Sequence, residues 1–212
     1  MKSVLIGAVL IFCSLISLSA ENVINQFSAI DSYSEKKDGG EIYPLGFSKN
    51  GYFAYISRYY GPECGYCPKF IVSNLITDKK IIEKQYYPEN AISGFVIHKK
   101  EVSELLVKYK IEFSHKTTLQ QFPYNYNGKT IDASLGPDYK LILKSNVKRK
   151  VVADLPEPIG YTEEVGSYNL IGFFLSPFEN RIAIVVQRKI SGWEAEPENE
   201  SFIYGAHLEK RF

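Results

Sequence analysis

Apolar and polar residues alternate along much of the chain, which is the spacing of half-buried β-strands. The pattern is clearest around Asn50-Gly51, where alternating segments stand on both sides of a short turn that starts at Lys49. Asn-Gly favours a tight hairpin turn because both residues tolerate positive φ. The pattern therefore predicts a hairpin whose second strand covers residues 52–59.

The same alternation predicts strands along the rest of the chain, separated by short turns and loops. Residues 113–128 are rich in Thr, Gln, Tyr and Asn, and we expect them to form a loop with limited structure. The further predicted strands are 69–72 with 74–76, 81–82, 130–135, 139–143, 148–153, 168–175, 181–189 and 201–208.

One segment, residues 97–111, has a different period. Val102, Leu105, Leu106 and Tyr109 recur at helical spacing and form a single apolar stripe. They predict one amphipathic helix that packs on a sheet.

Two stretches of the chain echo each other. Residues 48–54 and 176–183 share a Ser, a turn, an apolar residue, an Ala and an aliphatic run, and the downstream strands carry Phe70-Ile71-Val72 and Phe202-Ile203-Tyr204 as counterparts. Repeated sheet units are typical of propeller blades, but a closed propeller needs about four or more of them. We therefore predict a mainly β fold of antiparallel sheet modules with propeller-like local repeats, as an incomplete propeller or a sandwich, plus one amphipathic helix near 97–111.

The N-terminus has the layout of a cleaved secretory signal. Lys2 precedes an apolar run over residues 4–16, and small residues up to Ala20 lead into the polar Glu21. The apolar run is shorter than the roughly 20 residues that a membrane-spanning helix needs. We expect cleavage after Ala20 or Ser19 and a secreted or periplasmic protein.

Length and charge limit the number of domains and the kinds of partner that the mature chain can have. Its length of about 190 residues predicts one β-rich secreted domain, 21–212, after a 1–20 signal peptide. Removal of the signal takes one base, Lys2, and no acid, so 24 basic and 24 acidic side chains remain. This balance does not favour nucleic acid as a partner. No later apolar run is long enough to span a membrane, and the partner stays unknown at this point.

Several short motifs follow one another along the chain. They are Leu45-Gly46-Phe47-Ser48-Lys49-Asn50-Gly51-Tyr52-Phe53-Ala54-Tyr55, Leu105-Leu106-Val107-Lys108-Tyr109, Ser176-Pro177, Arg181-Ile182-Ala183, Gly192-Trp193-Glu194 and Phe202-Ile203-Tyr204-Gly205. With these motifs the chain resembles, over most of residues 41–208, a bacterial family of predicted secreted proteins of unknown function. The resemblance implies export without implying an activity.

Cys64-Gly65-Tyr66-Cys67 is the sharpest candidate for chemistry. In an oxidising compartment the pair can form a structural disulfide that clips a hairpin loop. The spacing also occurs in thiol–disulfide exchange proteins, where a helix N-terminus at the first Cys lowers the thiol pKa. Here Pro68 and the β-branched run that follows favour a strand, so the structural disulfide is the preferred interpretation, with a redox pair as the alternative.

Aromatic residues mark a second candidate site. Tyr124 and Tyr126, together with Trp193 and Glu194, could form a platform on which a sugar or peptide stacks. The carboxylates between Glu194 and Glu200 could also supply oxygen ligands to Ca²⁺, although a solvated acidic loop is the simpler interpretation.

Signatures of the common enzyme classes are absent from the sequence: there is no phosphate-binding loop, nucleophile elbow or His-Glu-x-x-His helix. His98, His115 and His207 have no paired spacing, so we predict no metal site and no cofactor. The predicted function is a non-enzymatic binding or envelope-associated module, with a cell-envelope protein or glycan as the kind of partner. The alternative is a thiol–disulfide oxidoreductase or isomerase that uses Cys64 and Cys67.

Overall fold

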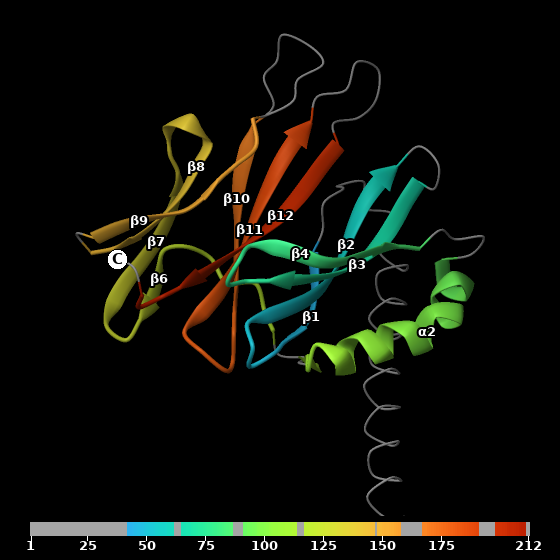
Figure 1. Ribbon diagram of the computed structural model, residues 1–212. Helices are drawn as coiled ribbons and strands as arrows, with labels where there is room; N and C mark the ends of the chain where they lie inside the picture. The colour runs from blue at the N-terminus through green and yellow to red at the C-terminus, as the bar shows by residue number, and fades with distance from the viewer. Residues whose placement is uncertain are drawn as a thin grey trace, which may run out of the picture.

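The computed structural model describes residues 42–61, 65–86, 91–113, 117–146, 148–157, 167–190 and 198–210. The predicted signal peptide, residues 1–20, lies outside these ranges. Within them the protein is mainly β, with three antiparallel sheets, none of which closes into a barrel, and one α-helix (Figure 1). No helix in the described part of the chain has the length and apolar character to cross a membrane.

The first sheet has the strand order β4-β3-β2-β1-β5. The predicted hairpin around Asn50-Gly51 joins β1 to β2, with Phe47 opposite Phe53 and Gly51 at φ 79°. The Ser48 hydroxyl oxygen accepts hydrogen bonds from the backbone N–H groups of Asn50 (3.3 Å) and Tyr52 (3.1 Å). The strands are β1 Ile42–Phe47, β2 Tyr52–Gly61, β3 Gly65–Asn74, β4 Lys79–Gln85 and β5 Glu112–Phe113.

The central sheet has the order β10-β11-β12 and contains the second copy of the repeated motif. Ser176 opens its first turn and accepts a hydrogen bond from the N–H of Phe178 (3.3 Å), as Ser48 does in the first copy. The strands are β10 Tyr168–Leu175, β11 Arg181–Ile190 and β12 Glu198–His207.

The pairing register corrects one detail of the repeat. Ala54 and Ala183 are equivalent, and two residues further on Ile56 pairs with Phe70 while Val185 pairs with Ile203. The counterpart of Phe70 is therefore Ile203, and the correspondence with Phe202 was wrong by one residue. Residue type alone misplaced it, because both strands begin their apolar run with Phe-Ile.

The outer sheet has the order β6-β7-β8-β9, and the 3-10 turn η1 Pro137–Tyr139 leads into β8. The expectation of a loop with limited structure over residues 113–128 was wrong in part. β6 lies within it, and Gln120 exchanges two backbone hydrogen bonds with Phe173 of β10. Partners distant in sequence order this polar segment. The strands are β6 Tyr124–Tyr126, β7 Lys129–Leu135, β8 Lys140–Ser145 and β9 Lys148–Asp154.

The helix α2, Ala91–Lys108, begins before the predicted residue 97 and ends before the predicted residue 111. Its end has a physical cause. Lys110 adopts φ 53°, and the N–H of Ile111 bonds back to the carbonyl of Leu106 (2.9 Å). This is a Schellman motif, which is hard to predict from the sequence because Lys occupies the position that usually holds Gly. The predicted stripe is confirmed: Val102 and Leu106 are buried against the first sheet.

The layers stack in the order α2, first sheet, central sheet, outer sheet, from right to left in Figure 1. Residues of β11 alternate between two cores. Val185 packs toward the first sheet with Phe53, whereas Ile184 packs toward the outer sheet with Leu141. The central sheet is therefore buried on both faces.

Candidate functional site

The cysteine pair lies at the edge of the described residues. Cys64 is outside them, and Cys67 lies in β3, paired with Tyr59 of β2. From Cys67 the chain continues as a strand to Asn74, and no helix begins at Cys67. The helix dipole that activates thiols in Cys-x-x-Cys oxidoreductases is therefore not supplied at this residue.

The predicted aromatic platform is only partly described, because Trp193 and Glu194 are outside the described residues. Tyr124 and Tyr126 lie on one face of the short strand β6 and pack, half-buried, against the core between the central and outer sheets. The ring of Tyr124 meets Phe173 edge-on, with 5.2 Å between the centroids. These two rings thus contribute to packing.

The predicted calcium segment is also mostly outside the described residues. At its end, Glu200 binds the guanidinium of Arg188 (2.5 Å), a neighbour on the adjacent strand. Arg188 also lies over the ring of Phe202 (5.3 Å to the centroid). The part of the chain that the structure describes holds no group of three or more His, Cys, Asp or Glu placed to bind a metal ion.

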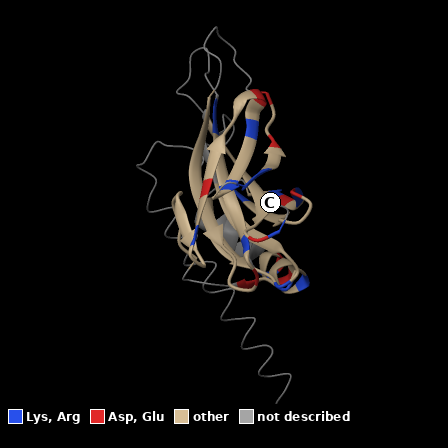
Figure 2. Ribbon diagram, turned by 90° about the vertical axis from the view of Figure 1, so that its left-hand side faces the viewer, with Lys and Arg blue, Asp and Glu red and all other residues tan. Residues whose placement is uncertain are grey.

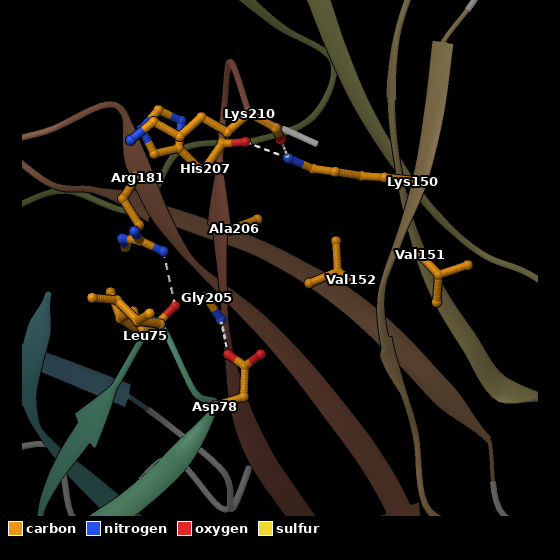
Figure 3. Close-up of a pocket in the computed structure, with 11 residues that line it drawn as sticks. Leu75, Asp78, Lys150, Val151, Val152, Arg181, Gly205, Ala206, His207 and Lys210 are labelled. Carbon is orange, nitrogen blue, oxygen red and sulfur yellow. Dashed lines mark hydrogen bonds between the residues drawn. The ribbon is translucent and has the colours of Figure 1, made fainter. Parts of the chain in front are cut away.

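A pocket that the sequence analysis did not predict lies where the three sheets meet (Figure 3). Its volume is about 310 Å³, near the lower limit of the range for small-molecule sites. We call it the junction pocket. Its lining residues are Leu75, Ile76 and Asp78 of the first sheet, Lys150, Val151 and Val152 of the outer sheet, and Arg181, Gly205, Ala206, His207 and Lys210 of the central sheet and the segment after it.

The turn between β3 and β4 forms the first wall of the junction pocket. Asn74 shapes this turn, because its side-chain oxygen accepts hydrogen bonds from the N–H groups of Ile76 (2.8 Å) and Thr77 (3.2 Å). The turn presents Asp78, which accepts a hydrogen bond from the N–H of Gly205 (2.6 Å). The first sheet is thereby tied to the edge strand of the central sheet.

Gly205 allows the β3–β4 turn to approach β12 this closely. A Cβ atom at residue 205 would lie 1.9 Å from the carbonyl oxygen of Leu75, a distance that no side chain tolerates. A glycine inside a strand often marks such a close backbone approach. This glycine was the one sequence signal that could have pointed to the junction pocket.

A bulge in β9 builds the opposite wall. Leu141 pairs with Ala153 and Ile142 with Val151, which leaves Val152 as the extra residue. Consecutive strand residues normally point to opposite faces, and a bulge redirects one of them. Val151 and Val152 consequently both line the junction pocket.

Basic side chains surround the pocket and also hold its walls together. The guanidinium of Arg181 donates to the carbonyl of Leu75 (3.1 Å) and to the carboxylate of Glu179 (2.7 Å). The ammonium of Lys150 donates to the carbonyls of His207 and Lys210, so it joins the outer sheet to the segment that follows β12 (Figure 3).

Burial and charge shift two titratable groups in the pocket. Burial raises the pKa of the Asp78 carboxyl, and the Gly205 N–H and the nearby Arg181 oppose part of this shift. Burial also lowers the pKa of His207, and the positive charges of Lys210 and Arg181 lower it further. The lowered pKa of His207 therefore reflects burial first and the surrounding positive charges second, with Glu179 opposing part of the shift.

Charged residues elsewhere on the described chain are mixed. In Figure 2 basic and acidic positions are interspersed along the ribbon and do not form a broad patch of one sign. The junction pocket, by contrast, brings together three permanently charged basic residues and one carboxylate.

Comparison with known proteins gives no match: no family model, no curated protein and no solved structure is similar to this chain. The resemblance to a family of secreted proteins therefore stays a prediction. The function has to be argued from the junction pocket itself.

Proposed function

We propose that this protein is an exported, non-enzymatic binding module and that its ligand binds in the junction pocket. The observation that carries the proposal is that hydrogen bonds fix the polar side chains of the pocket in place. Asp78, Lys150 and Arg181 are each engaged in hydrogen bonds that connect the three sheets. Groups used in this way give a preorganised binding surface, which lowers the cost of binding.

A catalytic role has less support from this geometry. General acid–base catalysis needs a side chain within hydrogen-bond reach of the reacting group and free to exchange a proton. The Asp78 carboxylate is instead occupied by a backbone N–H, and His207 accepts a hydrogen bond at Nδ1 from the N–H of Glu209 (3.2 Å). Export, and the description of the sheets as an incomplete propeller, belong to this proposal as well. They have their support in the N-terminal pattern and in the repeated hairpin.

A fragment screen tests the proposal. The mature chain, residues 21–212, would be labelled with ¹⁵N and titrated with a library of small molecules. We expect hits that shift the amide signals of Gly205, Ala206 and Val152. Val151→Trp should abolish these shifts, because residue 151 is 55% exposed at the rim and a large ring there fills the pocket without entering the core.

Val107→Trp is the matched control. Val107 is 47% exposed on α2, away from the junction pocket, so this variant should retain every hit. Hits that survive Val151→Trp, or no hits near Gly205, would refute the binding site. Turnover of a bound fragment would refute the non-enzymatic role.

Export is tested separately. N-terminal sequencing of the protein made from the full gene in a bacterial host should find a first residue of Glu21 or Ala20. An intact Met1 N-terminus would exclude the signal peptide.

A further inference from the structure

The charges that line the junction pocket are unequal. Lys150, Arg181 and Lys210 are permanent cations at neutral pH, whereas Asp78 is the one carboxylate among the lining residues. Figure 3 places Asp78 beside Gly205, on the side away from Lys150 and Lys210. The part of the pocket near the two lysines is therefore positive.

Arg181 keeps part of its hydrogen-bonding capacity. Its Nε and Nη1 atoms bind Glu179 and Leu75, but Nη2 has no partner within the described chain. Its side chain is only 13% exposed. A partly buried guanidinium with a free donor favours an anion, and a carboxylate in particular, because the two planar groups match in geometry.

Lys210 supplies a second available cation. Its carbonyl accepts from Lys150, but no ion pair involves its ammonium among the residues described here. Glu179 neutralises part of the charge of Arg181, so the two lysines, Lys150 and Lys210, account for much of the remaining positive charge.

The other wall of the pocket is apolar. Ile76 and Val151 are each 55% exposed, more than any other exposed large hydrophobic side chain among the described residues. They face the pocket from two different sheets, together with Val152. A ligand that covers these side chains would gain hydrophobic free energy.

From this combination we propose that the junction pocket binds a small organic carboxylate with a short aliphatic body. The carboxylate lies against Arg181 and Lys210, and the aliphatic body covers Ile76 and Val151. This inference rests on the proposed binding function and names the ligand class for the same site.

Four probes test the ligand class: hexanoate, hexanol and hexylammonium share a six-carbon chain, and acetate is a carboxylate without that chain. Each is titrated into the ¹⁵N-labelled mature protein while the amides of Gly205, Ala206 and Val152 are monitored. We expect hexanoate to bind with a Kd on the order of 1 mM. Hexanol should bind more weakly, because it lacks the charge, and acetate because it lacks the aliphatic body. Hexylammonium should not bind.

Lys210→Gln should weaken hexanoate about fivefold, because the contribution of a partly exposed charge pair is at most about 1 kcal/mol. Lys148→Gln is the matched control: it removes an equal charge from β9 at an exposed residue outside the pocket. It should leave the Kd unchanged. High salt should weaken hexanoate and spare hexanol.

Each outcome decides a separate claim. If hexanol or hexylammonium binds as well as hexanoate, or if Lys210→Gln has no effect, the carboxylate class is wrong while the junction pocket remains a binding site. If none of the four probes shifts the pocket amides, the carboxylate inference fails. The fragment screen then decides whether the pocket binds any ligand.

Discussion

At the scale of single residues, Gly205 has the clearest role. Its missing side chain lets the backbone of Leu75 approach β12, and its N–H meets the carboxylate of Asp78. One position thus connects two sheets and forms part of the junction pocket.

Gly205→Ala is predicted to destabilise the protein by about 3 kcal/mol, because the added methyl group overlaps backbone atoms that cannot move aside cheaply. Gly128→Ala is the comparison. Residue 128 has φ 73° but no atom within 4 Å of its Cβ position, so only backbone strain of about 1 kcal/mol is expected. Urea denaturation of both variants measures the difference. Equal losses would show that the close approach to Leu75 has no energetic importance.

His207 is predicted to titrate below its ordinary pKa of 6.5. The unfolded chain then takes up the proton first, so the stability contributed by neutral His207 is present above pH 6.5 and falls as the pH drops through the folded-state pKa. NMR titration of the imidazole measures this pKa.

Lys210→Gln should move the pKa of His207 upward, toward 6.5, because Lys210 is the positive charge that lowers this pKa most. Lys148→Gln should not change it. A midpoint at or above 6.5 in the unsubstituted protein would contradict the positive environment inferred for the junction pocket.

At the scale of elements, the two repeated hairpins share a buried Ser at the start of the turn. Ser48 accepts two backbone N–H groups, whereas the hydroxyl of Ser176 accepts one. The Asn50-Gly51 turn could be predicted from the sequence because its preference is local. The pairing of β1 with β5 could not, since the sequence contains no local signal for it.

Ser48→Ala is predicted to cost about 2 kcal/mol and Ser176→Ala about 1 kcal/mol, because the first leaves two partly buried N–H groups without their acceptor and the second leaves one. The two variants control for each other, since the same atom is removed from equivalent positions. Thermal and chemical denaturation would measure both. A larger loss for Ser176→Ala would mean that these hydrogen bonds do not determine the stability of the hairpins.

At the scale of the whole molecule, the central sheet connects the two outer layers. Ile184 and Val185 are consecutive residues of β11, and each is buried in a different core. A substitution that destabilises the outer sheet should therefore also destabilise the first sheet.

Leu141→Ala, in the outer sheet, is predicted to lower global stability by about 3 kcal/mol. Native-state hydrogen exchange should show the amides of Ala54 and Ile56, in the first sheet, losing protection by the same free energy. Val151→Ala, at an exposed valine of the same sheet, should change little. If the first sheet keeps its protection while β7 to β9 lose theirs, the sheets unfold independently.

The sequence by itself determined most of the segments that become strands, but not β5 or β6, together with the hairpin at Asn50-Gly51 and the apolar stripe on α2. These features follow from the alternation of side chains and from local turn chemistry, which act over a few residues. The three strands of the central sheet were also predicted from the sequence, although their pairing into one sheet was not.

Only the tertiary structure decided how the sheets stack and where a ligand could bind. The junction pocket draws Asp78, Lys150 and Arg181 from three different sheets, and its apolar wall depends on a bulge in β9. No short segment of the chain contains that information. It arises when distant strands pack together, and packing depends on the shapes of surfaces that exist only in the folded molecule.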